Sequence, residues 1–161
     1  MVYAGDNDLA EGRTPAQVLE SFQGFVRAVR AELPQARIGY ISIKPSPARA
    51  GLLPQVRETN ALLKAYVGTL PNVDYIDIYH PMLDAQDQPR TELYGPDRLH
   101  MNAAGYALWR GVIGPYVLPS ADGRGKPPVL TATAAPSSRP LVTAVSAGAA
   151  AESASVSLRK P

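Results

Sequence analysis

The fold is decided by one stretch, residues 97–109, which read DRLHMNAAGYALW. An acid and a histidine, Asp97 and His100, stand three residues apart just before an apolar run with helical spacing. One loop can hold both groups, so that the Asp97 carboxylate accepts the imidazole Nδ1–H and leaves Nε2 free to take a proton. Asn102 is a suitable N-cap, and we expect a helix over residues 102–117.

A second stretch stands at the other end of the folded part. Residues 2–8 read VYAGDND, a short apolar run that breaks into Gly-Asp-Asn-Asp, which predicts a strand end followed by a loop. The amide of Asn7 is a potential donor to a reacting carbonyl oxygen. Gly, Asp and Asn equally suit an ordinary turn, and an Asp-x-x-His pair also occurs in loops without any chemistry. Each motif taken separately therefore leaves both interpretations open.

Together and in this order, the two stretches resemble the SGNH hydrolases, also called GDSL-type esterases and lipases. Residues 5–8 are similar to the family's G-x-N-D block, whose Asn donates to the oxyanion, and residues 97–100 to its D-x-x-H block, which supplies the acid and base of a Ser-His-Asp triad. The resemblance covers about residues 1–118 and implies hydrolysis of a small ester substrate without a cofactor. It implies catalytic roles for His100, Asp97 and Asn7, and substrate-binding roles for Gly5, Asp6 and Asp8.

The sequence departs from the family pattern at its start. The family blocks that carry the nucleophilic Ser and a Gly of the oxyanion hole lie upstream of G-x-N-D, whereas four residues precede Gly5 here. We therefore expect an SGNH domain truncated at its N-terminus, with weak or no esterase activity alone. Ser46 has no G-x-S-x-G or G-D-S context and is interpreted as a polar loop residue. Lys44 and Arg49 are interpreted as solvated charges, with a position beside a substrate pocket as the alternative.

The other histidine, His80, precedes Pro81 and is interpreted as lacking an acid at triad spacing, which favours a structural or exposed role. A metal-dependent phosphoesterase is an alternative function, because carboxylates and imidazole are common metal ligands. Its candidate ligands are Asp6, Asp8, Asp97 and His100. A non-catalytic remnant, or a half-domain that needs an N-terminal partner, is a further alternative. The ester itself stays open among short acyl esters, carbohydrate acetyl esters and lysophospholipids.

Apolar spacing predicts strands alternating with helices. Helices are expected over 15–33, opened by the Thr-Pro-Ala-Gln capping box at residues 14–17, and over 52–68. Strands are expected over residues 2–4, 37–43 and 73–78. This order forms βαβ units and predicts an α/β, three-layer parallel-sheet (flavodoxin-like) SGNH fold, truncated at the N-terminus. The core is expected to include Phe22, Phe25, Ala104, Tyr106, Ala107, Leu108, Trp109 and Val112.

In parallel sheets, ligands lie beyond the carboxyl ends of the strands. Residues 5–8, 44–49 and 79–84 leave the predicted strands at that edge, and the loop 97–100 must reach it if His100 is to face Asn7. The two strands that the family would add beside residues 2–4 are not part of the sequence, so we expect an uncovered apolar edge. Low solubility, self-association or pairing with an N-terminal half-domain is the expected result.

Composition separates the 161 residues into two parts. Residues 1–118 contain 11 Lys/Arg and 12 Asp/Glu, a net charge of −1, which gives no nucleic-acid footprint. Residues 119–161 contain 5 Lys/Arg and 2 Asp/Glu and are rich in Ala, Ser and Pro, so a disordered tail is expected there. The sequence contains no cysteine, which excludes disulfides and thiolate chemistry within it.

The sequence shows neither a membrane span nor an export signal. No segment approaches the ~18 apolar residues that a bilayer span requires. The N-terminus lacks the basic and apolar regions of a signal peptide. As translated, the chain is expected to stay in the cytoplasm, although intact relatives could be exported.

Overall fold

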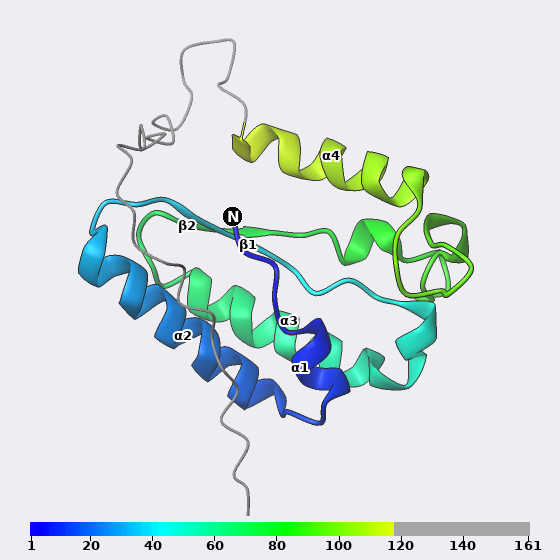
Figure 1. The fold of residues 1–161 in the computed structure, drawn as a ribbon, viewed down its shortest axis with the longest axis horizontal. Coiled ribbons are helices and arrows are strands. Elements are labelled where there is room, and N and C mark those ends of the chain that lie inside the picture. Colours follow the sequence, from blue (N-terminus) through cyan, green and yellow to red (C-terminus); the bar gives the residue numbers. More distant parts are fainter. Residues whose placement is uncertain (118–161) are drawn as a thin grey trace, which may run out of the picture. The chain divides into compact units, whose positions relative to one another are not determined.

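A computed structural model of the chain describes residues 1–117 (Figure 1). Helices and strands follow in the order α1 (Asp6–Ala10), α2 (Pro15–Glu32), β1 (Ile38–Ile41), η1 (Pro47–Leu52), α3 (Leu53–Val67), β2 (Val73–Ile76), η2 (His80–Met82), η3 (Thr91–Leu93) and α4 (Ala103–Val117), where η marks a 3₁₀ helix. The long helices lie within one residue of their predicted bounds, and both later strands are two to three residues shorter than expected. The predicted tail, 119–161, lies outside the described residues.

The sheet is parallel, as predicted. β1 pairs with β2 so that Ile38 lies opposite Val73 and Ile41 opposite Ile76. On the other side of β1, Val2 forms a parallel bridge to Tyr40: the Val2 N–H donates to the Gly39 carbonyl (2.8 Å), and the Ile41 N–H donates to the Val2 carbonyl (2.9 Å). The strand predicted over residues 2–4 is thus a single bridge, because the chain turns into α1 at Gly5.

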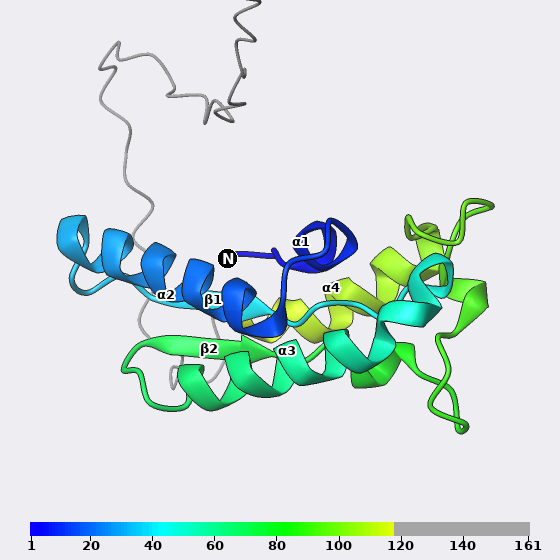
Figure 2. The same cartoon turned by 90° about the horizontal axis from the view of Figure 1, so that it is seen from below.

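Helices cover both faces of this sheet, which gives the three layers that the sequence predicted (Figures 1 and 2). α2 and α3 pack on one face, where buried side chains at helical spacing meet the strands. These are Val18, Phe22 and Val26 of α2, Leu63 and Val67 of α3, and Ile38, Tyr40 and Ile43. α4 packs on the other face against Ile41, Ile76, Ile78, Met82, Leu93 and Tyr94.

The buried face of α4 differs from the prediction by one residue position. Leu108, Trp109 and Val112 pack against the core as expected, together with Ile113 and Tyr116. Ala104 and Ala107 are exposed instead, and so is Tyr106, with 56% of its surface accessible. Small and amphipathic side chains can occupy either face of a helix, so the apolar pattern alone did not fix its rotation. The prediction that Phe25 of α2 is a core residue is also wrong. Its surface is 41% exposed, and its ring stacks on the buried Phe22.

Two buried polar side chains hold the chain where it leaves the strands. The Asn60 amide donates to the Ile43 carbonyl (2.9 Å) and accepts from the Ile43 N–H (2.8 Å), which fixes the exit from β1. The Ser42 hydroxyl accepts from the N–H groups of Ile78 and Tyr79 at 3.0 Å each, which fixes the exit from β2. Both loops at the carboxyl edge therefore start from rigid points. Over residues 1–117, no helix has both the length and the apolar character needed to cross a membrane.

Candidate active site

The loop before α4 holds the predicted acid and base in contact. Asp97 Oδ2 lies 2.5 Å from His100 Nδ1, and Asp97 Oδ1 accepts the N–H groups of Leu99 and His100 at 3.0 Å each. The hydrogen bond from His100, followed by those from the two backbone N–H groups, lowers the pKa of Asp97 to about 2. The carboxylate is thus a fixed acceptor that directs Nε2 away from itself. The imidazole side chain is 80% exposed.

His80 has an acid partner, which corrects the sequence interpretation. Asp77 stands three residues before it, and Asp77 Oδ2 lies 2.7 Å from His80 Nδ1. This spacing is the one that pairs Asp97 with His100. The His80 side chain is 72% exposed, close to the value for His100. The chain therefore contains two aspartate–imidazole pairs with the same local geometry, and only their surroundings distinguish them.

The surroundings of His100 include Asn7. Both residues line one open pocket of about 190 Å³, whose other lining residues are Tyr3, Asp6, Lys44, Arg49 and Leu99. His80 is not among them. The pocket joins the chain after Val2, the loop after β1 and the loop before α4. These segments meet at the carboxyl edge of the sheet, where a parallel sheet is expected to bind its ligand.

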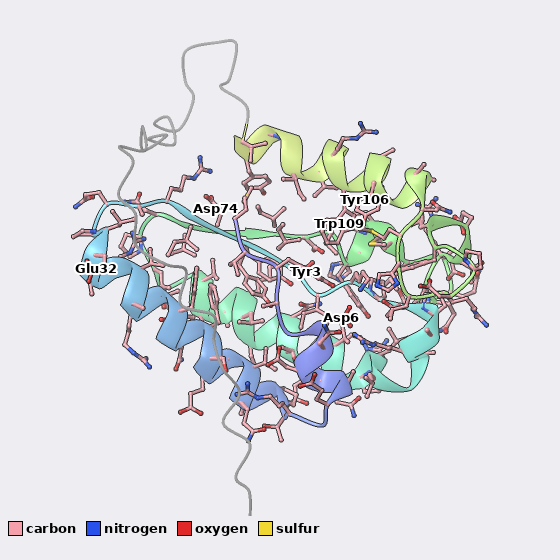
Figure 3. All side chains as sticks on the ribbon, viewed as in Figure 1. Tyr3, Asp6, Glu32, Asp74, Tyr106 and Trp109 are labelled. Carbon is pink, nitrogen blue, oxygen red and sulfur yellow. The ribbon has the colours of Figure 1, made fainter. Side chains whose placement is uncertain are left out.

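Asp6 is the buried centre of this pocket and lies close to Tyr3 (Figure 3). Its Oδ2 pairs with the Lys44 ammonium and accepts from the Tyr3 hydroxyl (3.2 Å), and its Oδ1 accepts from Arg49 Nη1 (2.5 Å). Burial alone would raise the pKa of Asp6, but the hydrogen bonds and charges of the two cations outweigh it and lower the pKa below 3.8. The same burial, with the nearby Asp6 charge, raises the pKa of Tyr3.

Lys44 and Arg49 are thus pocket residues, and their interpretation as solvated charges is wrong. Lys44 is buried, with 9% of its surface exposed. Sequence reasoning missed this because their common partner, Asp6, is about 40 positions away along the chain. Ser46 lies in the loop before η1, as predicted, and its side chain is buried.

Two predicted substrate-binding residues lie in a second, mainly apolar pocket. Gly5 and Asp8 line it together with Val18, Phe22 and Phe25. Asp8 pairs with Arg13 (3.0 Å). Gly5 has φ +105°, a left-handed conformation that favours glycine, and a Cβ there would lie 2.7 Å from Ile43 Cδ1. Gly5 and Asp8 therefore contribute to the start and the anchoring of α1 and do not line the His100 pocket. Of the Gly-Asp-Asn-Asp motif, only Asp6 and Asn7 line that pocket.

Each of the four potential metal ligands is bound to a protein partner. Asp6 is engaged by two cations, Asp8 pairs with Arg13, and Asp97 bonds His100. Within residues 1–117 no group of three His, Asp or Glu side chains is placed to hold a metal ion. Among these residues the phosphoesterase alternative has no three-ligand cluster to support it.

Fold and site together define a class: a three-layer α/β protein with an aspartate–histidine pair and an asparagine at the carboxyl edge of a parallel sheet. Comparison with known families gives the assignment. A model of the GDSL-like lipase/acylhydrolase family matches residues 1–108, two thirds of the chain, and the chain belongs to that family. No curated protein matches it significantly.

Solved structures share the fold at low sequence identity. A protein from Streptococcus pneumoniae, provisionally described as a platelet activating factor, is 18% identical with a TM-score of 0.63 and matches 71% of this chain. A GDSL-like lipase from Bacteroides thetaiotaomicron (20%, TM-score 0.59) and a provisionally described acylhydrolase from Bacteroides fragilis (21%, TM-score 0.60) each match 70%. The match spans 57% to 58% of those three chains.

Proposed function

We propose that this chain carries the base and part of the oxyanion hole of a carboxylic ester hydrolase. The observation that carries the proposal is that His100, oriented by Asp97, and Asn7 line one pocket at the carboxyl edge of a parallel sheet. Family membership supports it, because lipases and acylhydrolases cleave esters. The substrate is accordingly an acyl ester of a small molecule or lipid.

In this mechanism the nucleophile is a serine that the family places upstream of the Gly-Asp-Asn-Asp motif. Its hydroxyl oxygen attacks the ester carbonyl carbon while His100 Nε2 takes the hydroxyl proton. Asn7 Nδ2–H donates to the oxyanion, and His100 returns the proton to the departing alcohol. Water then attacks the acyl-serine in the same way and releases the acid. Asp97 holds the imidazole in the required tautomer throughout.

Residues 1–118 are, in this proposal, a partial domain completed by a half-domain that brings the serine. Two observations support this. Val2 uses both its N–H and its carbonyl toward β1, so the opposite edge of its segment is available to another strand. The His100 side chain is 80% exposed, whereas a closed active site shields its base from water. In this proposal the esterase rate depends on that serine, because loss of one triad member removes most of the rate.

The experiment compares the 161-residue chain alone with the chain combined with the protein segment encoded directly upstream of it. Ester hydrolysis is followed with p-nitrophenyl acetate. His80→Ala is the matched control for His100→Ala. Any exposed imidazole paired with an aspartate can react slowly with an activated ester, and the loss of rate in His80→Ala measures that background. We expect His100→Ala to lower the rate of the combined protein at least about 100-fold, and His80→Ala to leave it unchanged.

Two results would contradict the proposal. Equal rates for both variants in the combined protein would exclude a special role for His100. Rapid turnover by the chain alone that disappears with His100→Ala would exclude the need for a second segment.

A further inference from the structure

Arg49 makes the contact that fixes the Asn7 side chain. Its Nη2 donates to Asn7 Oδ1 (2.8 Å), while its Nη1 donates to Asp6 Oδ1 (2.5 Å). Asn7 and Arg49 are 42 positions apart in the sequence, and Arg49 lies in the 3₁₀ turn η1. A single guanidinium therefore joins α1 to the loop that leaves β1.

The direction of this hydrogen bond decides which end of the amide is available. A guanidinium has only donors, so it can bind the amide oxygen and never the amide nitrogen. With Oδ1 held by Arg49, the end of Asn7 that stays available is Nδ2, the donor that an oxyanion requires. Without Arg49, a half-turn of the amide would exchange donor and acceptor at little cost.

Arg49 is itself held from two sides. The buried Asp6 carboxylate fixes its guanidinium, and the Lys44 ammonium fixes the other carboxylate oxygen. On the backbone, the adjacent Ala48 N–H donates to the Arg98 carbonyl (3.0 Å), in the middle of the loop that carries Asp97 and His100. The turn that presents Arg49 thus touches both halves of the pocket.

We propose that Arg49 is a positioning residue that orients the Asn7 amide nitrogen toward the oxyanion and, through its turn, keeps Asn7 in register with the His100 loop. This rests on the proposed function for the role of Asn7. Lysine is not an equivalent residue here, because a single ammonium lacks the planar fork that binds Asp6 and Asn7 at once.

The first test needs no catalysis. In the ¹⁵N-labelled 161-residue chain, the Asn7 side-chain amide is assigned by its loss in Asn7→Ala. We expect Arg49→Lys to move that amide pair toward the position of freely exposed asparagines. Arg13→Lys is the matched control, because Arg13 also bonds a carboxylate of α1 but does not contact Asn7. An Asn7 amide that does not move in Arg49→Lys overturns the proposal.

If Arg49→Lys fails to fold, a second measurement on the unsubstituted chain tests the same contact. In the unsubstituted chain, nuclear Overhauser contacts are expected between the Arg49 guanidinium protons and the Asn7 side chain. Their absence also overturns the proposal.

The kinetic test uses the combined protein of the preceding section. We expect Arg49→Lys to lower kcat about 10-fold, less than the ~10²–10³ that loss of a whole oxyanion donor causes, with KM changed less than about twofold. If Asn7→Ala lowers kcat and Arg49→Lys does not, the positioning role is wrong and the proposed function stands. If Asn7→Ala leaves kcat unchanged, the oxyanion role of Asn7 fails, and the proposed function fails with it.

Discussion

At the residue scale, Asp6 holds the pocket together. Its side chain is buried, and each carboxylate oxygen is bound to a different cation, Lys44 or Arg49. A buried charge is tolerable only when it is paired, because leaving it unpaired in a low-dielectric site costs several kcal/mol. Asp6 therefore determines the stability of this edge of the molecule as well as the shape of the pocket.

Asp6→Asn is expected to destabilise the fold by about 3 kcal/mol, because two partly buried cations lose their only counter-charge in the pocket. Urea unfolding at pH 7 measures the loss. Asp8→Asn is the control: its partner Arg13 is exposed, and an exposed pair contributes less than about 1 kcal/mol. Similar losses in both variants would show that the Asp6 cluster is not a buried ion network.

Lowering the pH should reduce the contribution of Asp6 to the stability of the fold. The pKa of Asp6 is lowered in the folded chain, so its contribution to stability is fully present above the ordinary value of 3.8 and is lost as the pH falls through the lowered value. The free energy of unfolding of the unsubstituted chain should therefore fall below about pH 4, and fall less steeply in Asp6→Asn. Urea titrations between pH 7 and pH 3 compare the two slopes; parallel slopes would contradict the lowered pKa.

Gly5 is the residue whose backbone lets the chain enter α1. Gly5→Ala must accommodate φ +105° and a Cβ 2.7 Å from Ile43 Cδ1, and we expect a loss of about 2 kcal/mol. Gly51→Ala is the control, because a Cβ there meets nothing within 4 Å. Thermal unfolding followed by circular dichroism should separate the two variants, and a neutral Gly5→Ala would refute the steric argument.

Residue identities could be predicted from the sequence only where partners are neighbours along the chain. The Asp97–His100 contact follows from a spacing of three residues, and the same rule applied to Asp77 and His80 would have found the second pair. The roles of Lys44 and Arg49 depend on a partner brought close by folding, which local patterns do not reveal.

At the element scale, Asn102 is the link between the base loop and α4. Its Oδ1 accepts from the N–H groups of Ala104 (2.9 Å) and Gly105 (3.1 Å), and its Nδ2 donates to the carbonyls of Glu92 and Tyr94. One side chain thus caps the helix, as the sequence predicted, and also ties it to the preceding loop, which the sequence did not indicate.

Asn102→Ala is expected to cost about 2 kcal/mol, the upper end for an N-cap, because both functions are lost. Asn102→Asp should keep the helix cap but lose the two donated hydrogen bonds. Its free energy of unfolding should therefore lie between those of the unsubstituted chain and Asn102→Ala. Denaturant unfolding of the three proteins measures the order. An Asp variant as stable as the unsubstituted chain would show that the bonds to Glu92 and Tyr94 contribute nothing.

The kinds and order of elements were predictable because amphipathic spacing and capping signals are strong for α2, α3 and α4. The exact ends of the helices and strands, and the short helix α1, were less predictable from the sequence. α1 was expected to be a loop, since Gly-Asp-Asn-Asp favours turns, yet Leu9 is buried against α2 and α3 and stabilises a short helix. Tertiary packing outweighed local preference there.

At the scale of the whole molecule, the sheet is unusually narrow. Two strands and one bridge carry three long helices, and within residues 1–117 no strand pairs with the outer edge of the Val2 segment. Beside that edge, Phe25 stays 41% exposed and lines the apolar pocket with Val18 and Phe22. An open edge next to exposed aromatic surface favours association with another polypeptide.

We therefore expect the purified 161-residue chain to self-associate. Light scattering after gel filtration should give a mass above the 17.1 kDa of the monomer, rising with concentration. Phe25→Ser should lower that mass, because it removes apolar surface beside the open edge. Leu33→Ser is the matched control: Leu33 is 61% exposed, but it follows the far end of α2. If both substitutions act equally, association is nonspecific; a monodisperse monomer at every concentration would show that residues of this chain already complete its sheet.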